Sequence, residues 1–329
     1  MSTTVRWGLL GTGRIARDFA TALRATPGAS IAAVASREHA TAAAFAAEFD
    51  IPLALGGYGS LAACPDVDLV YIGTPHALHA DNALAMLAGG KGVLCEKPFA
   101  LNRAQAETVV TAARSRNLFL MEAMWTRYMP AMAEVRRILA SGVLGQVSQA
   151  SADFGFVAAG GPEARLFNPA LGGGALLDVG IYPLSITAFL LGDVQDVRAQ
   201  AELGPTGVDL QTVFTLRHAG GALSTCSCSL KARTPGLLTL SGTNGQLRLD
   251  APFHRPPTIT LLLADAPPRV IATPYLGNGY VHEAIEAQRC WQAGLIESPA
   301  MTHGQTLHLM GVLDEIRAQT GVRYPGDGG

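Results

Sequence analysis

Charged residues are scarce in this sequence. Asp, Glu, Lys and Arg make up 15% of its 329 residues, and the formal net charge is -2. The charges are interspersed, so no basic run indicates binding to nucleic acid or to an anionic membrane. We therefore expect the partner to be a small molecule or another protein.

Cysteine is also scarce, and its spacing is uninformative. The sequence has five cysteines, at Cys64, Cys95, Cys226, Cys228 and Cys290. They form neither the dense framework of a disulfide-stabilised domain nor the C-x-x-C pairs of a structural zinc site. We interpret them as reduced thiols.

A long uninterrupted apolar segment is missing. The stretch from Ala175 to Leu191 has nearly the length of a membrane span, but it contains Asp178, Tyr182 and Pro183. The first residues, Met1 to Trp7, lack the apolar core of a secretory signal and lead directly into a predicted strand. The expected location is the cytoplasm, with no membrane partner.

Apolar residues, in contrast, are plentiful and follow two different patterns. They make up 49% of the chain, and the length favours two domains over a single core. In residues 1–125, predicted strands at 5–10, 30–35, 69–73, 92–97 and 118–123 alternate with helical segments. Such alternation predicts an α/β domain with a doubly wound parallel sheet, the Rossmann architecture.

The pattern changes in residues 126–329. A helix from Pro130 leads into short strands separated by Gly, Pro and Asn, which predicts an α+β domain with a large, mostly antiparallel, open-faced sheet. The expected strands are 146–156, 197–202, 211–217, 222–231, 237–241, 246–250 and 258–263. Two amphipathic helices, 279–293 with Ile285 facing inward and 303–319, end the domain. We expect one sheet face to pack on helices, and the other, with Thr225, Cys226, Ser227 and Cys228 near its middle, to form a homodimer surface.

A glycine-rich turn follows the first predicted strand. Gly11-Thr12-Gly13-Arg14-Ile15-Ala16 fits G-x-G-x-x-A between a strand and a helix. Gly11 allows the tight turn, Gly13 lets the backbone approach a pyrophosphate, and Ala16 leaves room for helix packing. This motif in this position predicts a dinucleotide site.

The second strand indicates which dinucleotide is bound. It ends in Ser36-Arg37, where an NAD site usually carries an acidic residue for the ribose 2'-hydroxyl. A hydroxyl beside a guanidinium suits a 2'-phosphate instead, with Arg14 as a second positive group. We therefore expect NADP(H); the alternative is a solvated Ser-Arg turn.

Two further strands end in polar groups. The strand 92–97 ends in Glu96-Lys97-Pro98, and the strand 69–73 is followed by Thr74-Pro75-His76 and by His79. The carboxyl ends of parallel strands meet at one edge, where ligands bind. We expect these residues to line the cofactor crevice. His76 and His79 lack a third ligand nearby, so we predict no metal site.

An apolar helix with two polar residues follows a glycine-rich loop in the second domain. Leu177, Ile181 and Leu184 have helical spacing, which places Asp178 and Tyr182 at i and i+4 on one face. A carboxylate and a phenol in an apolar helix suggest a reactive pair. The alternative is a core tyrosine with Asp178 as its hydrogen-bond partner.

Together these residues resemble the glucose-fructose oxidoreductase, inositol dehydrogenase and rhizopine-catabolism (Gfo/Idh/MocA) family. The resemblance covers nearly the whole chain through the glycine motif, Glu96-Lys97-Pro98 and the run from Gly173 to Tyr182. The stretches 121–127, 241–245 and 297–299 are most similar to dimeric dihydrodiol dehydrogenases and NADP-dependent D-xylose dehydrogenases. Many members carry histidine in place of Tyr182, and tyrosine is characteristic of the dihydrodiol and glucose-fructose branches.

The resemblance implies an NADP-dependent oxidoreductase acting on a sugar or cyclic diol. It places Lys97 and Tyr182 at the reacting carbon, with Asp178 orienting the pair. Trp125, Phe154 and Arg127 are expected either to contact substrate or to pack in the core. Rival functions are a glucose-fructose-type enzyme that retains its cofactor, a nucleotide-sugar ketoreductase, and a non-catalytic NADP sensor or scaffold.

Overall fold

The computed structural model of the chain describes residues 4–327. Met1, Ser2 and Thr3, part of the N-terminal segment considered above, lie outside this range. The chain forms two compact units, one of Met1–Trp125 with Leu276–Leu307 and one of Thr126–Tyr275 with His308–Gly329. Each unit is built around its own sheet.

The first unit contains a six-stranded parallel sheet, which confirms the predicted α/β architecture. The strand order is β3-β2-β1-β4-β5-β6, that of a doubly wound nucleotide-binding domain. The strands are β1 (Val5–Leu10), β2 (Ala29–Ser36), β3 (Leu53–Gly56), β4 (Leu69–Ile72), β5 (Gly92–Glu96) and β6 (Leu120–Ala123). Because all run in one direction, their carboxyl ends share one edge.

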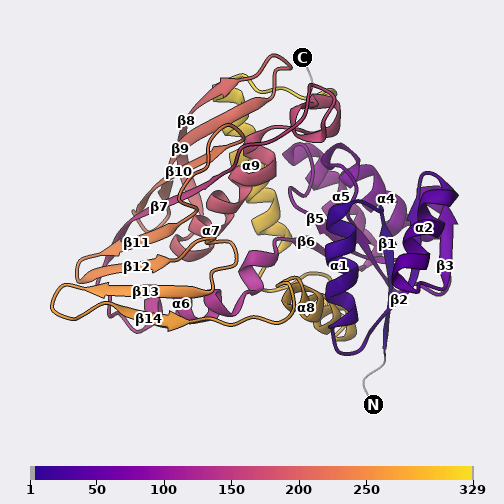
Figure 1. Cartoon of the computed structure of the whole chain (residues 1–329), viewed down its shortest axis with the longest axis horizontal. Coiled ribbons are helices and arrows are strands. Elements are labelled where there is room, and N and C mark those ends of the chain that lie inside the picture. The colour runs from indigo at the N-terminus through magenta and orange to yellow at the C-terminus, as the bar shows by residue number, and fades with distance from the viewer. Residues whose placement is uncertain (1–3, 328–329) are drawn as a thin grey trace. The chain divides into compact units, whose positions relative to one another are not determined.

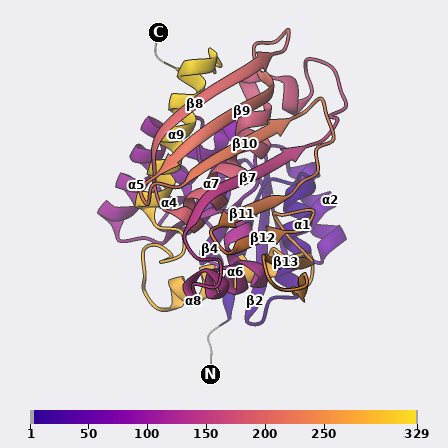
Figure 2. The same cartoon turned by 90° about the vertical axis from the view of Figure 1, so that its left-hand side faces the viewer.

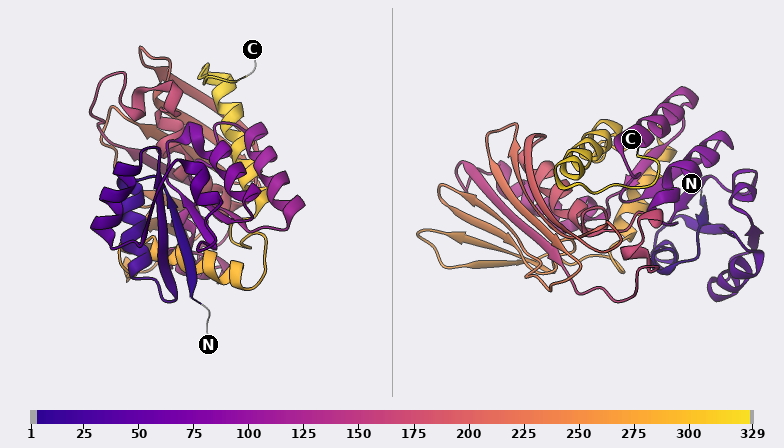
Figure 3. Two further views of the ribbon diagram at one scale, coloured as in Figure 1. Left: turned by 90° about the vertical axis from the view of Figure 1, so that its right-hand side faces the viewer. Right: turned by 90° about the horizontal axis from the view of Figure 1, so that it is seen from above.

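Helices cover both faces of this sheet (Figure 3, left). The helix α1 contacts α8, while α4 packs between α3 and α5. The helical segments are α1 (Arg14–Arg24), α2 (His39–Phe49), α3 (Tyr58–Ala62), α4 (His79–Ala88), α5 (Arg103–Arg116), α8 (Val281–Gln292) and the 3-10 turns η1 (His76–Leu78) and η2 (Trp125–Tyr128).

Buried aromatic rings join α1 to the sheet. Phe19 stacks on Tyr71 at a centroid distance of 3.8 Å, and Trp7 meets Phe19 edge-on at 5.6 Å. All three are fully buried. Large rings in this arrangement remove much apolar surface from water, so they fix α1 and its glycine turn against β1 and β4.

The second unit contains an eight-stranded sheet in the order β14-β13-β12-β11-β7-β10-β9-β8 (Figure 1). Every neighbouring pair is antiparallel except β7 and β10, which confirms the predicted mostly antiparallel sheet. The strands are β7 (Val147–Gly155), β8 (Val194–Leu203), β9 (Asp209–His218), β10 (Leu223–Ser229), β11 (Leu238–Gly242), β12 (Gly245–Leu249), β13 (Thr258–Leu263) and β14 (Arg269–Ala272).

Among residues 4–327, helices pack on only one face of this sheet. The helix α7 contacts β7 and β10, α6 contacts β13, and Gln319 of α9 bonds to the backbone of β8. These segments are α6 (Pro130–Ala140), the 3-10 turns η3 (Arg165–Phe167) and η4 (Pro169–Leu171), the π-helical turn η5 (Leu176–Gly180), α7 (Ile181–Leu191) and α9 (His303–Thr320), which begins in the first unit.

The other face is open, and the strands lie uncovered across Figure 2. Thr215, Thr225 and Ser151 are exposed and occupy one row across β9, β10 and β7. Cys226 and Cys228, predicted on this face, are buried instead, at 0% and 1% exposure. Since strand side chains alternate, the cysteines point to the helix-covered face and only their neighbours reach the open one.

The segment Pro169–Leu191, which includes α7, is apolar and buried. Its length and mean hydropathy of 1.7 would allow a membrane span, but 83% of its most apolar window is buried within the described structure. All the residues from Ile181 to Ala188 are buried. This is the environment of a core helix in a folded domain.

Some elements differ from those expected. The short segments β3, α3 and β14 have no counterpart in the prediction, because four or five residues carry too little periodicity to detect. The segment Leu276–Leu307, assigned by the sequence to the second domain, groups with the first unit. Ile285 on α8 is 37% exposed rather than inward.

Candidate functional site

The glycine turn between β1 and α1 has the geometry of a pyrophosphate cradle. Gly11 has φ +106, and a Cβ there would lie 3.0 Å from the Gly73 carbonyl oxygen, so only glycine fits. Around Gly13 no atom lies within 4 Å of a Cβ position, and α1 has no side-chain cap. The first N–H groups of α1 therefore remain available to an anion.

Two arginines lie exposed beside this turn. Arg14 begins α1 and Arg37 follows β2, while Ser36 is buried. Arg17 and Arg24 on α1 pair with Glu48 and Asp50. Across residues 4–327, no such ion pair involves Arg14 or Arg37. Their guanidinium groups are therefore suited to meet a phosphate.

The end of β5 places Lys97 at the carboxyl edge of the parallel sheet. Glu96 is 4% exposed, and its Oε1 accepts a hydrogen bond of 2.7 Å from the Tyr71 hydroxyl. Its Oε2 accepts the Lys97 backbone N–H at 3.2 Å. Glu96 thus has a structural role in fixing the Lys97 backbone; its predicted contact with the cofactor stays a prediction.

His79 ties two of the strand ends together. It is fully buried, with Nδ1 2.8 Å from the Pro98 carbonyl oxygen and Nε2 2.9 Å from the Thr74 carbonyl oxygen. Thr74 Oγ1 also accepts a bond from Asn82. His76, also buried, meets the His79 ring edge-on at 5.6 Å. The polar groups after β4 and β5 are therefore brought together, as predicted from the parallel topology.

A buried carboxyl group from α8 was missed by the sequence analysis. Glu283 is 0% exposed, and neither carboxyl oxygen has a hydrogen-bond partner among the described residues. Burial and the nearby charge of Glu96 raise the pKa of Glu283 well above its ordinary value. No local pattern could identify it, because it lies almost two hundred positions from Glu96 in the chain.

In the second unit, Asp178 and Tyr182 lie at a helix start that differs from the prediction. Residues Leu176–Gly180 form a π-helical turn, and α7 begins only at Ile181. The expected α-helical i, i+4 pair is therefore wrong in detail, since Asp178 belongs to the wider turn. Single π turns inside helices occur often at functional sites. Asp178 is 7% and Tyr182 6% exposed.

Asp178 is paired with an arginine that the sequence analysis did not identify. Arg165 Nη1 donates to Asp178 Oδ1 at 2.9 Å, and the Asp178 side chain is 11% exposed. A partly buried charge-assisted bond restrains the carboxylate strongly. The predicted orientation of Lys97 and Tyr182 by Asp178 stays a prediction, since Lys97 belongs to the first unit and Asp178 to the second.

Tyr182 lies in a group of aromatic rings. The Phe154 ring is 5.4 Å from Tyr182, and the His254 ring stacks on Phe154 at 4.6 Å with an interplanar angle of 3°. Tyr182 and His254 are 5.5 Å apart. Phe154 was predicted; His254, in the β12–β13 connection, was missed because a histidine in a Pro-rich loop carries no local signal.

The remaining predicted substrate residues are buried in different units. Trp125, in the first unit, is 3% exposed and its ring lies 4.4 Å from that of Tyr280. Arg127, in the second, is 5% exposed, donates to the Ser185 hydroxyl at 3.1 Å and lies over Phe189. These contacts give Arg127 a packing role, and its substrate contact stays a prediction.

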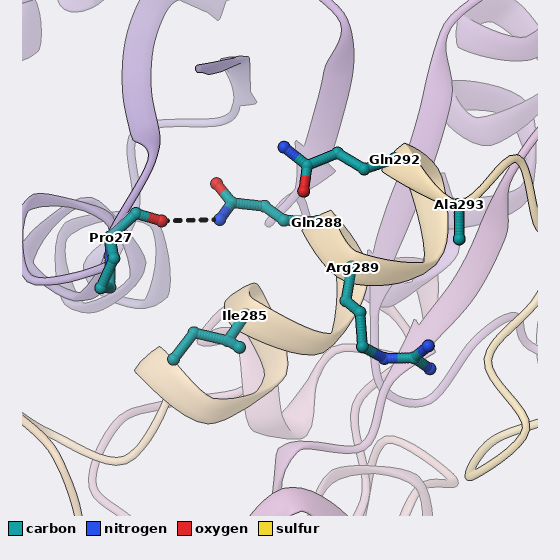
Figure 4. A pocket seen from close by; sticks show the side chains of 6 residues that line it. All are labelled: Pro27, Ile285, Gln288, Arg289, Gln292 and Ala293. Carbon is teal, nitrogen blue, oxygen red and sulfur yellow. Dashed lines mark hydrogen bonds between the residues drawn. The ribbon is translucent and has the colours of Figure 1, made fainter. Parts of the chain in front are cut away.

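A groove of about 450 Å³ lies elsewhere, on the exposed side of α8 (Figure 4). Gln288 crosses it to donate to the Pro27 carbonyl oxygen at 3.0 Å. Its lining contains none of the predicted site residues, so we assign it no role in the chemistry.

Among the described residues, no group of three or more His, Cys, Asp or Glu side chains could hold a metal ion.

Comparison with known families finds two matching models. Residues 5–124 match the oxidoreductase family with an NAD-binding Rossmann fold, and residues 132–248 match the GFO/IDH/MocA C-terminal domain. Trans-1,2-dihydrobenzene-1,2-diol dehydrogenase from Danio rerio is 38% identical over 98% of this chain and 99% of its own length. The same enzyme from Homo sapiens is 36% identical over 98% and 99%.

Several solved structures are also similar to this chain. KijD10, a 3-ketoreductase from Actinomadura kijaniata in complex with NADP and TDP-benzene, is 27% identical with a TM-score of 0.88, covering 97% of this chain and 98% of its own. Levoglucosan dehydrogenase with NADH and levoglucosan is 21% identical with a TM-score of 0.87, covering 96% and 97%. At that identity the second likeness concerns the fold alone.

Proposed function

We propose that this chain, which belongs to the GFO/IDH/MocA oxidoreductase family, is an oxidoreductase that uses a nicotinamide cofactor bound by the first unit. The observation that carries the proposal is the position of Lys97 directly after β5, at the sheet edge that also holds the glycine turn. Relatives named as diol dehydrogenases and a ketoreductase support chemistry at a CH–OH group.

NADP(H) is the preferred cofactor in this proposal. When bound, the nicotinamide supplies or accepts the hydride. The open space around Gly13 and the uncapped start of α1 suit the pyrophosphate, and the exposed Arg14 and Arg37 suit a 2'-phosphate. KijD10, at 27% identity, is described with NADP.

In this proposal, Tyr182 and Lys97 transfer the hydroxyl proton of the substrate. Oxidation of an alcohol needs a base for its hydroxyl proton, and a phenol near an ammonium group serves because the positive charge favours the phenolate. In reduction Tyr182 donates the proton instead. Asp178, held by Arg165, orients the pair from the π turn.

The substrate is a sugar or a cyclic diol, with D-xylose or a trans-dihydrodiol favoured. The stacked Phe154 and His254 rings beside Tyr182 provide a flat apolar surface with a polar edge. Such a surface suits a ring that carries hydroxyl groups. The diol dehydrogenases at 36–38% identity support the diol.

The test is steady-state turnover over a panel of aldoses and trans-diols, followed by NADPH absorbance. Lys97→Ala and Tyr182→Phe should each reduce kcat by about 100-fold or more, the range for losing a general acid or base. Both should retain NADPH affinity in a fluorescence titration. Lys231→Ala, which removes an exposed lysine paired with Glu202, serves as the control. Turnover at the wild-type level in either site variant would refute the assignment.

A nucleotide-sugar ketoreductase is the second candidate, because a 3-ketoreductase with NADP and TDP-benzene is among the similar structures. Including TDP-linked 3-keto sugars in the panel distinguishes it. A glucose-fructose-type enzyme would keep its cofactor through dialysis. A sensor or scaffold would bind NADPH yet turn over nothing in the panel.

The proposed assembly is a homodimer through the open sheet face. The exposed row of Thr215, Thr225 and Ser151, with Val213 at 51% exposure nearby, is the surface offered to a second copy. We also propose a cytoplasmic location, supported by five free cysteines, all buried.

A further inference from the structure

The π turn that carries Asp178 is held by a carboxylate from a distant strand. The turn has no cap from its own segment. The Leu176 N–H donates instead to Asp209 Oδ2 at 2.8 Å. Asp209 is the first residue of β9, 33 positions further along the chain. It satisfies a backbone donor that the start of a helix leaves unpaired.

One oxygen of the Asp209 carboxylate accepts two hydrogen bonds. Asp209 is 0% exposed, and the Thr212 hydroxyl donates to the same Oδ2 at 2.7 Å, while Oδ1 has no hydrogen-bond partner among the described residues. Burial raises the pKa of Asp209, while the bonds from Thr212 and from the Leu176 backbone favour the charged form. A buried carboxylate is costly unless it is hydrogen-bonded, and its donors here come from the turn and from β9.

The glycine loop before the turn is shaped around this carboxylate. Gly174 has φ +113, and a Cβ at this position would lie 2.3 Å from Asp209 Oδ1. A Cβ at Gly173 would lie 2.7 Å from the carbonyl oxygens of Arg165 and Leu166, and the Tyr324 hydroxyl donates to the Gly173 carbonyl oxygen at 2.5 Å. The loop therefore has one close-fitting arrangement, with Asp209 at its centre.

The residues of the proposed chemistry come directly after Leu176 in the chain. Asp178 is two positions after Leu176, and Tyr182 follows in the first turn of α7. Displacing the Leu176 backbone would move Asp178 away from Arg165 and turn Tyr182 relative to Phe154. We propose that Asp209 is a positioning residue for Tyr182, acting through the π turn. This inference rests on the proposed function.

The experiment compares Asp209→Ala with wild type in the full-length protein. Both donors bond to Oδ2, a position that an asparagine oxygen would still fill, whereas alanine removes the acceptor for the Leu176 N–H and the Thr212 hydroxyl. We expect kcat to fall by about 10- to 100-fold, the effect of a small displacement of a reacting group. NADPH affinity should stay unchanged, because the glycine turn belongs to the other unit.

The distinguishing measurement is the primary isotope effect with NADPH deuterated at the transferred position. A mispositioned Tyr182 slows hydride transfer itself, so the isotope effect on kcat should rise in Asp209→Ala. Asp68→Ala is the matched control. Asp68 also accepts a backbone N–H, from Arg6 at 2.9 Å, but lies at the amino end of β4. Its kcat and isotope effect should match those of wild type.

Thr212→Val is a second variant in case Asp209→Ala does not fold. It keeps the carboxylate and removes one donor, so a smaller fall in kcat and a smaller rise in the isotope effect are expected. A folded variant with wild-type kcat and isotope effect would overturn the inference, as would parallel loss of turnover and NADPH affinity. Wild type that is inactive over the whole panel would instead contradict the proposed function, and the inference with it.

Discussion

Glu96 and Lys97 are neighbours in the chain but have different surroundings. Glu96 is buried under hydrogen bonds from Tyr71 and from the Lys97 backbone, while Lys97 is half-buried at the sheet edge. One position at the strand end thus separates a buried carboxylate from a half-buried ammonium group, because successive side chains point to opposite sides.

Arg37→Ala tests the cofactor preference. The variant should bind NADP about tenfold or more weakly and NAD unchanged, since only NADP has the 2'-phosphate and a charge-assisted bond contributes about 1.5–3 kcal/mol. Fluorescence titration with both dinucleotides measures this. Arg24→Ala, an exposed arginine paired with Asp50, should change neither affinity. Equal losses of affinity for NADP and for NAD would exclude a contact between Arg37 and the 2'-phosphate.

Glu283→Gln tests the buried carboxyl of α8. Because the pKa of Glu283 is raised well above 4.5, folding takes up a proton, and the stability falls as the pH rises from about 4.5 toward the raised pKa. The glutamine cannot ionise. The variant should therefore gain in free energy of unfolding relative to wild type between pH 5 and pH 8, in urea titrations. A difference that is constant across this range would show that Glu283 does not titrate as described.

At the scale of elements, glycines decide how closely η5 and α7 approach the sheet. Gly180 ends the π turn over β10, where a Cβ would lie 2.8 Å from Cys228 Sγ and 3.2 Å from Leu176 Cδ1. Cys228 is fully buried with Val179 and Leu230 in the same apolar cluster. A methyl group there requires the helix to move off the strand.

Gly180→Ala should therefore destabilise the protein by about 1–3 kcal/mol, the cost of overpacking a core. It should also lower kcat, because the displaced turn carries Asp178. Thermal or urea unfolding with parallel kinetics measures both effects. Gly161→Ala is the control, since nothing lies within 4 Å of its Cβ position. A variant as stable as wild type would mean that the contact with Cys228 relaxes freely.

At the scale of the whole molecule, the two units carry separate parts of the proposed chemistry. The first holds the glycine turn, Lys97 and Trp125; the second holds Asp178, Tyr182 and Phe154. The sheet of the second unit leaves one face uncovered (Figure 2). This uncovered face is the surface on which we propose that a second copy packs.

The dimer prediction is tested by light scattering after size-exclusion chromatography. Thr225→Arg and Val213→Arg place charge on the open face, and each should convert a dimer to a monomer at micromolar concentration. Leu295→Arg, at a 41% exposed leucine of the first unit, should remain dimeric. A wild-type monomer, or a dimer unaffected by both open-face changes, would contradict this surface.

By itself, the sequence predicted most strands and helices of both units, though not β3, α3 or β14, together with the glycine turn and the gathering of Thr74, His79 and Lys97 at one sheet edge. These follow from local periodicity and from the rule that parallel strands end together. Only the tertiary structure revealed the Arg165–Asp178 pair, the Asp209 cap, Glu283 and His254. The reason is physical: these contacts join loops and strands far apart in the chain, and no local pattern encodes where a long-range hydrogen bond or ring contact will form.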